Sequence, residues 1–323
     1  MSPLSAVAVL AIPVALQAQL PGGVTPEAYA GELAAIVEAA PRLPHAGAPL
    51  PLSAPREGWA LGMVSWVAAD RSGLTYLLQR GDAADPIVVV DREGTVVRSW
   101  GKGLYATPHS IRVDPDGNVW TTDAKTSVVR KFSPEGRPLL EIEVGGLPEG
   151  CDGAFCGTTD VAFGPGGRIF ISDGYRNARI LEYRPDGTRV REWGGPGTGP
   201  GEFRLPHSLV VDEEGVVYVA DRENGRVQRF DLEGRWLGEW PRYGKTFALE
   251  LAPGAVWLAS QYPHQPNLSP GWLIKVDRAS GRVLGYVPAT GSHGIHATPA
   301  GELLQAPGPE QKPQRFTAPG GGR

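Results

Sequence analysis

Three histidines, His109, His207 and His293, have a spacing that suggests chemistry. Each stands eight residues before a turn glycine, and these glycines are Gly117, Gly215 and Gly301. The chain of 323 residues holds 6 histidines, so half of them occupy one repeated position. Repeats bring equivalent residues to equivalent points in space, and three imidazoles that meet at one point make a metal site.

The elements that position these histidines are expected to be short strands in repeated units. The unit reads apolar strand, Asp-x-x-Gly, second strand, Asp, polar turn, third strand, a second glycine turn and a fourth strand, most clearly over 207–240. The first glycine of the unit recurs roughly every 45 residues, at Gly73, Gly117, Gly167, Gly215, Gly254 and Gly301. Six copies of four strands predict an all-β fold, a six-bladed β-propeller.

Histidine alternates with small hydroxyl residues at the repeated position. Counting back eight residues from each glycine gives Ser65, His109, Thr159, His207, Thr246 and His293. Blades two, four and six of a six-bladed ring are related by about 120°, so the histidines should converge on the central channel. The alternative is that they line the channel as polar residues bridged by water. Three imidazoles with an open fourth position are typical of a catalytic zinc site, although other divalent metals remain open.

Composition and charge fit a turn-rich β protein. Glycine (44) and proline (31) are each about twice as frequent as average, and they fall singly between short apolar runs. The net charge is −4 and there is no basic stripe, which argues against a nucleic-acid partner. After the first residues, no segment is apolar enough to predict a membrane span.

The N-terminal region is expected to lie outside the propeller. Residues 1–18 contain an apolar stretch that ends in small residues, which predicts a signal peptide; a misassigned start or a plain helix is the alternative. Residues 19–55 should form a helix, over 25–41, and a linker. The propeller is expected over 56–316, with a strand from within 45–60 closing its short sixth blade, and 317–323 as a flexible tail.

The two cysteines, Cys151 and Cys156, lie in a Gly-rich loop. In an oxidising compartment a local disulfide is favoured over two free thiols, and a metal role is the weaker reading. Together with the signal peptide, this predicts a secreted or periplasmic protein.

Four segments of blades three and four resemble the peptidyl-α-hydroxyglycine α-amidating lyase family. They read Phe-Cys-Gly-Thr-Thr-Asp from Phe155, Ser-Asp-Gly-Tyr-Arg-Asn from Ser172, Gly-Glu-Phe-Arg-Leu-Pro-His-Ser from Gly201 and Ala-Asp-Arg-Glu-Asn-Gly from Ala220. That family is itself a six-bladed propeller of NHL-type repeats. The resemblance runs from about 61 to 304, is strongest over 155–230 and is weak in blade five.

The resemblance implies a set of site residues. Zinc would be held by the three histidines, and the catalytic residues would be Tyr175, Arg80 and Arg222. A structural calcium would be held by the main-chain carbonyls of Val67 and Ile111 and by an Asp that follows the third histidine.

Two positions depart from the family. Gly294 stands where the calcium-binding Asp is expected, which puts calcium in doubt. Arg176 replaces a cysteine that the family pairs with the residue matching Cys156, so here Cys156 pairs with Cys151 or stays free. We read His45, His264 and His296 as non-ligands.

The function implied is a secreted zinc-dependent lyase that cleaves the C–N bond of a peptidyl or N-acyl α-hydroxyglycine, giving an amide and glyoxylate. Zinc would acidify the substrate hydroxyl, and Tyr175, with its pKa lowered by neighbouring cations, would take the proton. Arg80 and Arg222 would hold the carboxylate. We expect a monomer acting on a small molecule or peptide. The alternatives are a non-catalytic NHL-type propeller that binds a protein or glycan, and a calcium-dependent lactonase or related hydrolase, which the His, Ser and Thr channel residues disfavour.

Overall fold

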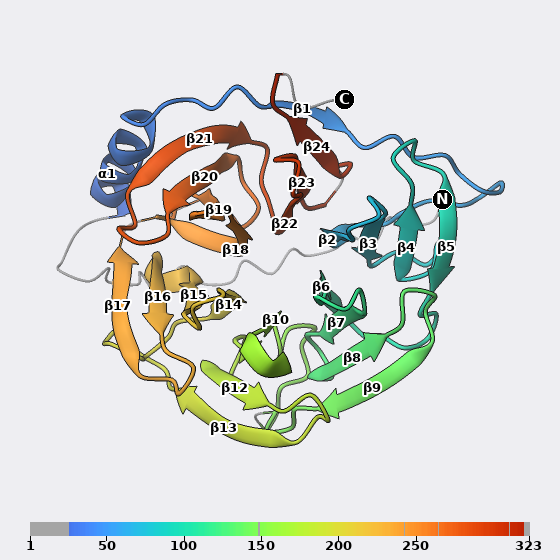
Figure 1. Cartoon of the computed structure of the whole chain (residues 1–323), viewed down its shortest axis with the longest axis horizontal. Helices are drawn as coiled ribbons and strands as arrows, with labels where there is room; N and C mark the ends of the chain where they lie inside the picture. Colours follow the sequence, from blue (N-terminus) through green and yellow to red (C-terminus); the bar gives the residue numbers. More distant parts are fainter. Residues whose placement is uncertain (1–25, 148, 242, 264, 310, 320–323) are drawn as a thin grey trace, which may run out of the picture.

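The computed structural model describes residues 26–147, 149–241, 243–263, 265–309 and 311–319. Its strands form six four-stranded antiparallel sheets arranged around a central axis (Figure 1). The first strand of each blade contacts the first strand of the next, and the first strand of blade six contacts that of blade one. The predicted six-bladed β-propeller is therefore confirmed. The signal peptide expected over 1–18 lies outside the described residues.

The first three blades each use four consecutive strands. Blade one contains β2 (Val64–Ala69), β3 (Thr75–Gln79), β4 (Ile87–Val90) and β5 (Val96–Trp100). Blade two contains β6 (Pro108–Val113), β7 (Val119–Asp123), β8 (Val128–Phe132) and β9 (Pro138–Glu143). Blade three contains β10 (Asp160–Phe163), the 3-10 turn η1 (Pro165–Gly167), β11 (Ile169–Asp173), β12 (Arg179–Tyr183) and β13 (Arg189–Gly194).

Blades four and five follow the same order, and blade six borrows a strand. Blade four contains β14 (Pro206–Val211), β15 (Val217–Asp221), the 3-10 turn η2 (Arg222–Asn224), β16 (Arg226–Phe230) and β17 (Trp236–Pro241). Blade five contains β18 (Lys245–Ala252), β19 (Ala255–Gln261), β20 (Gly271–Asp277) and β21 (Val283–Ala289). Blade six contains β22 (Gly294–Ala297), β23 (Leu303–Ala306), β24 (Gln314–Thr317) and β1 (Ala46–Pro49).

The N-terminal strand β1 closes the ring, as the sequence predicts. It pairs antiparallel with β24, with Ala46 opposite Thr317 and Pro49 opposite Gln314. β1 is the outermost strand of blade six, so the two ends of the propeller are joined by backbone hydrogen bonds (Figure 1). This pairing covers the edge that β24 would otherwise expose.

The helix α1 (Pro26–Glu38) packs against the outside of blade five, near β21, which confirms the predicted helix and its location. Pro26 occupies the first turn, where its missing N–H has no intrahelical partner to lose. Leu33 and Val37 lie four residues apart, on one face, and both are fully buried against a cluster that includes Trp240.

Burial falls from the axis outward within each blade. In blade one every residue of β3 and β4 is buried, whereas β5 alternates between exposed and partly buried. The inner strands are sandwiched between neighbouring blades, so both of their faces need apolar or satisfied polar side chains. This explains their continuous apolar runs.

The Asp-x-x-Gly turn fixes the register of the inner hairpin. In blade two the Asp114 carboxylate accepts the backbone N–H groups of Asp116 and Asn118, and Gly117 has a φ of 87°. Asp114 also accepts the Trp120 indole N–H at 2.9 Å. In blade two this register holds from the turn to Ile111 and shifts between Ile111 and Pro108, beside His109.

A disulfide joins Cys151 to Cys156 and confirms the predicted local bridge. It closes the loop that precedes β10, and the Cys156 N–H donates to the Ala124 carbonyl at 2.8 Å. Among the described residues no helix combines the length and the hydrophobicity that crossing a membrane requires.

Candidate metal centre

The three repeated histidines meet on the axis of the propeller. His109 and His207 are the second residues of β6 and β14, and His293 immediately precedes β22. All three are buried, and their ring centroids are 4.7 to 5.0 Å apart. The possible ligand atoms of the three rings all lie within 4.8 Å of one another, close enough to bind one metal ion. His293 completes the triangle despite the neighbouring Gly294.

Each histidine is oriented by a backbone carbonyl of the next blade. The Nδ1 atoms of His109, His207 and His293 lie 2.6, 2.7 and 2.7 Å from the carbonyl oxygens of Thr159, Phe247 and Ser65, respectively. A carbonyl only accepts, so each Nδ1–H must donate and each Nε2 keeps its lone pair. Metal-binding histidines typically donate their other ring N–H to such an acceptor. These hydrogen bonds therefore orient the three imidazoles so that each Nε2 can bind a cation.

The histidines are held neutral. Burial lowers the pKa of His293 to about 3 and lowers the pKa of His109 and His207 well below the usual value; the positive charges of Arg80 and Arg222 act in the same direction. A metal ligand must be the neutral imidazole. The donor set therefore fits a metal that prefers nitrogen ligands, such as zinc.

The intervening hydroxyl residues do not join the centre. Ser65 donates to the Leu78 carbonyl at 3.2 Å, and Thr159 and Thr246 pair with Ser172 and Ser260 at 2.6 and 2.8 Å. These bonds lie within their own blades, and the Thr159 hydroxyl is also 2.8 Å from the Pro206 carbonyl oxygen of blade four.

Tyr175 places its hydroxyl beside the free histidine nitrogens. Its oxygen is 2.8 Å from Nε2 of His109 and 3.4 Å from Nε2 of His207. The loop that carries it is held because Asp173 accepts from Asn177 and Arg179, and because the Tyr175 N–H donates to the Gly157 carbonyl. Tyr175 thus covers the open side of the histidine triangle.

The pKa of Tyr175 differs from the sequence-based expectation. The neighbouring Arg222 and Arg80 do favour the phenolate, but burial of the ring is the larger effect and raises the pKa. Desolvation of a charge outweighs two nearby cations because the phenol has left water almost entirely. Without a bound cation the hydroxyl therefore stays protonated.

Arg80 lies beside the centre with an incomplete set of partners. Its Nε donates to the Pro108 carbonyl at 2.9 Å, and its guanidinium carbon lies 5.3 Å from the centre of the Phe155 ring. Its Nη2 is buried and has no hydrogen-bond partner. A buried, unpaired guanidinium nitrogen is costly, so this group is suited to receive an anion.

Arg222 is also near Tyr175, and it is more fully engaged. It opens η2, is 5% exposed, and donates from Nε and Nη2 to Glu223, both at 2.9 Å. Its guanidinium lies 4.8 Å from the centre of the Phe247 ring, and Glu223 also pairs with Lys245 at 3.4 Å. Asp221 holds this turn by accepting from Asn224, as Asp173 holds the Tyr175 turn in the preceding blade.

Several residues that complete the site were not predicted. Trp66 is fully buried, with ring centroids 5.8 to 6.5 Å from all three histidine rings. Phe155 packs on Tyr175 at 4.9 Å, and Phe247 on His207 at 5.3 Å. Their positions in the sequence could have indicated them. Trp66 and Phe247 each follow the repeated hydroxyl residue, and Phe155 precedes a disulfide cysteine.

A cavity of about 750 Å³ adjoins Arg80 and leads away from the histidines over blade one. Its wall includes Trp59, Tyr105, Phe155 and Pro108, and charged groups such as Lys102 also line it. Pro108, which precedes His109, and Arg80 both line it, whereas the three histidines do not.

The main-chain carbonyls to which the resemblance assigns calcium belong to two adjoining inner strands. Val67 and Ile111 lie in the neighbouring inner strands β2 and β6, and their side chains are buried in the core. A β-carbon added at Gly294 would lie 2.6 Å from the Trp66 ring and 2.9 Å from the Trp66 Cα. The expected carboxylate at 294 therefore has no room.

Fold and site together define an NHL-type six-bladed propeller with a buried three-histidine centre. The NHL repeat matches residues 203–230, in blade four. Mouse (Mus musculus) peptidyl-glycine alpha-amidating monooxygenase is 31% identical over 258 residues, which cover 69% of this chain and 26% of that protein. Peptidyl-alpha-hydroxyglycine alpha-amidating lyase 1 of Drosophila melanogaster is 41% identical over 150 residues, 42% of this chain and 27% of that protein.

These matches confirm the resemblance to the amidating lyases. The chain spans about a quarter of the length of these two curated relatives. A solved structure described as streptogramin B lyase has a TM-score of 0.60, with 16% identity over 84% of this chain and 97% of that chain. That likeness supports the propeller fold alone.

Proposed function

We propose that this protein is a zinc-dependent lyase that cleaves the C–N bond of a peptidyl or N-acyl α-hydroxyglycine to an amide and glyoxylate. One observation carries the proposal: the Tyr175 hydroxyl stands 2.8 Å from Nε2 of His109, one of three histidines preset to hold a cation. The lyases named among the relatives support the reaction class.

The reaction moves one proton and breaks one bond. The substrate hydroxyl loses its proton, its O–H electrons form the C=O of glyoxylate, and the C–N bond electrons leave with the amide nitrogen, which gains a proton. His109, His207 and His293 would hold zinc through Nε2. When bound, zinc would polarise the substrate hydroxyl and add positive charge that favours the phenolate of Tyr175.

We assign the proton transfer to the Tyr175 oxygen. It lies on the open side of the histidine triangle, so a substrate hydroxyl placed there would be in hydrogen-bond reach. The same oxygen can return the proton to the departing nitrogen, which keeps the enzyme unchanged after turnover. Arg222, packed near Tyr175, would stabilise the phenolate.

We assign the glyoxylate carboxylate to Arg80. Its buried Nη2 has no partner, and a carboxylate would supply two acceptors for the guanidinium. The acyl or peptide part of the substrate would then occupy the cavity of about 750 Å³ that adjoins Arg80. The Trp59, Tyr105 and Phe155 rings in its wall suit an apolar or aromatic residue before the hydroxyglycine.

We also propose that the protein works outside the reducing cytosol, secreted or periplasmic, as a monomer. The Cys151–Cys156 disulfide supports the proposed location, because such bonds persist in oxidising compartments. The bridge closes the loop that carries Phe155, so it would also preserve one wall of the cavity.

The test combines metal content with turnover. Zinc is measured in the purified full chain, and glyoxylate release is measured from an N-benzoyl α-hydroxyglycine, for the wild type, His207→Ala and the control His45→Ala. His45 is partly exposed and stands just before β1, the outermost strand of blade six, with its Nε2 3.2 Å from the Gly301 carbonyl oxygen. We expect about one zinc per chain and turnover in the wild type and the control, and neither in His207→Ala. A wild type that binds no metal and releases no glyoxylate would favour a binding propeller instead.

A further inference from the structure

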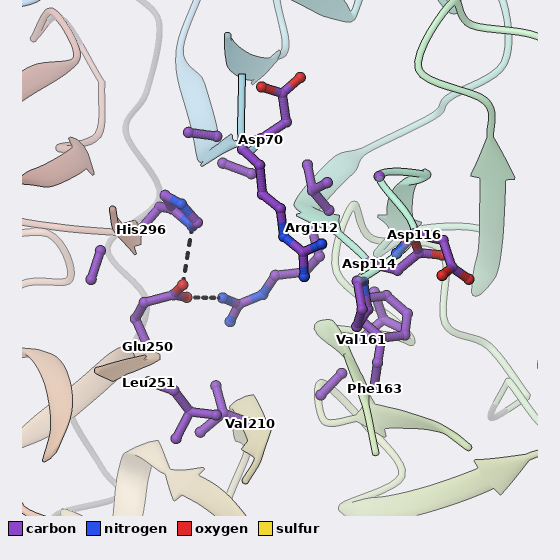
Figure 2. Close-up of a pocket in the computed structure, with 18 of the residues that line it drawn as sticks. Asp70, Arg112, Asp114, Asp116, Val161, Phe163, Val210, Glu250, Leu251 and His296 are labelled. Carbon is purple, nitrogen blue, oxygen red and sulfur yellow. Dashed lines mark hydrogen bonds and ion pairs between the residues drawn. The ribbon is translucent and has the colours of Figure 1, made fainter. Parts of the chain in front are cut away.

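A charged cluster occupies the other end of the central channel. Arg112 from β6 lies between Asp160 from β10 and Glu250 from β18, and His296 from β22 contacts Glu250 at 3.0 Å. Figure 2 shows Glu250 between Arg112 and His296, and all three line a cavity of about 720 Å³. We call these four residues the axial cluster. They join the inner strands of four blades.

The Arg112 guanidinium is surrounded by oxygen atoms. Its Nε and Nη2 donate to the two carboxylate oxygens of Asp160 at 3.1 and 2.6 Å, and its Nη1 donates to Glu250. Nη2 also reaches the Leu249 carbonyl at 3.1 Å and the Ser208 hydroxyl at 3.3 Å. The Arg112 side chain is 10% exposed and that of Asp160 is fully buried. This is a buried cation held by two carboxylates, a carbonyl and a hydroxyl.

The cluster adjoins residues to which the family resemblance assigns calcium. Arg112 follows Ile111 in β6, and its guanidinium carbon lies 5.0 Å from the centre of the Trp66 ring. Trp66 precedes Val67 and fills the space that a side chain at Gly294 would need. Hard cations such as calcium need six to eight oxygen ligands. Here the carboxylate at 294 is missing, and the nearby oxygens already hold a guanidinium.

We propose that Arg112 replaces the structural calcium of the amidating lyases, so that this chain ties its inner strands with its own side chain and does not bind calcium. A second positive ion beside a buried guanidinium would face like-charge repulsion in a region of low dielectric. The two carboxylates would otherwise repel each other across the channel, and the guanidinium neutralises that repulsion.

The test uses calcium chloride as the probe and melting temperature as the readout, so it does not depend on turnover. The full chain is dialysed against calcium-free buffer containing zinc, and Tm and calcium content are measured with and without millimolar calcium. The variants are Arg112→Ala and the control Arg278→Ala, whose arginine pairs with Glu213 at the surface. Magnesium serves as the control ion.

We expect no stoichiometric calcium in the wild type or the control, and a calcium-induced change in Tm below about 1 °C. Arg112→Ala removes the guanidinium that pairs with both Asp160 and Glu250, so its Tm should fall in calcium-free buffer. Calcium at about 100 times its Kd should then raise it by roughly 4 °C.

Two results would overturn the proposal. One is a wild-type chain that retains one calcium after dialysis or gains several degrees of Tm from it. The other is an Arg112→Ala protein that melts like the wild type in calcium-free buffer. If Arg112→Ala does not fold, the wild-type calcium measurement still decides, and Arg112→Lys, which keeps one positive charge, replaces it.

Discussion

The two ends of the central channel differ in how completely their buried arginines are hydrogen-bonded. At the histidine end, the buried Nη2 of Arg80 has no hydrogen-bond partner, and the Tyr175 hydroxyl is the neighbour of Nε2 of His109 and His207. At the Arg112 end, all three guanidinium nitrogens donate to side-chain or backbone oxygens. Trp66 contacts both groups, with the histidine rings at 5.8 to 6.5 Å and the guanidinium at 5.0 Å.

This difference indicates how one propeller can place a ligand-binding group and a stabilising group at opposite ends of the same channel. Buried polar atoms that lack partners are costly, so they are retained where a ligand completes them. A cluster whose charges are paired internally holds the blades together without a ligand. We therefore propose that the histidine end carries the chemistry and that the Arg112 end supports the structure.

The largest effect should come from removing a histidine. His207→Ala should abolish zinc binding and lower glyoxylate release by about 10³-fold or more, because the zinc that polarises the substrate hydroxyl would be lost. Metal analysis and initial rates check this, with His45→Ala unchanged. Full activity in His207→Ala would contradict the proposal that the reaction takes place at the histidine end of the channel.

Tyr175→Phe should lower kcat by about 10²- to 10⁴-fold, the usual contribution of a positioned proton-transfer group, while zinc content stays at the wild-type value. Tyr218→Phe is the matched control, because that hydroxyl pairs with Asp212 within blade four. Unchanged kcat in Tyr175→Phe would remove Tyr175 from the mechanism and leave the metal centre intact.

Trp66→Ala should destabilise the fold by about 3–5 kcal/mol, because a fully buried indole that packs on both ends of the channel is replaced by a cavity. Chemical denaturation measures this, and Trp236→Ala, at a tryptophan that is 43% exposed, should change stability by less than about 0.5 kcal/mol. Equal stabilities for the two variants would contradict the role of Trp66 as the shared support.

The smallest effect should come from Arg80→Gln. Loss of one charge-assisted contact to the carboxylate, about 1.5–3 kcal/mol, should reduce kcat/KM by about 10- to 100-fold with the zinc retained. Arg235→Gln, at an exposed arginine, is the control. If kcat/KM is unaffected by Arg80→Gln, the carboxylate is bound elsewhere, and Arg222 becomes the residue to examine.

The sequence by itself determined the blades and the convergence of the histidines. Hairpin turns depend on a few neighbouring residues, and Gly117 adopts the positive φ that its Asp-x-x-Gly segment predicts. The equal spacing from the turn glycines then brings His109, His207 and His293 together on the axis. The sequence also indicated that an N-terminal strand would close blade six, but only pairing with β24 fixed it at Ala46–Pro49.

Tertiary structure alone decided the environment of these groups. The pKa of Tyr175 follows the depth of its burial, which no local pattern reports. Arg112 reads in sequence as an ordinary strand residue, because its partners Asp160 and Glu250 are 48 and 138 residues away. The conformation of a turn depends on residues adjacent in sequence. Desolvation and charge pairing depend instead on which distant residues the closed ring brings together.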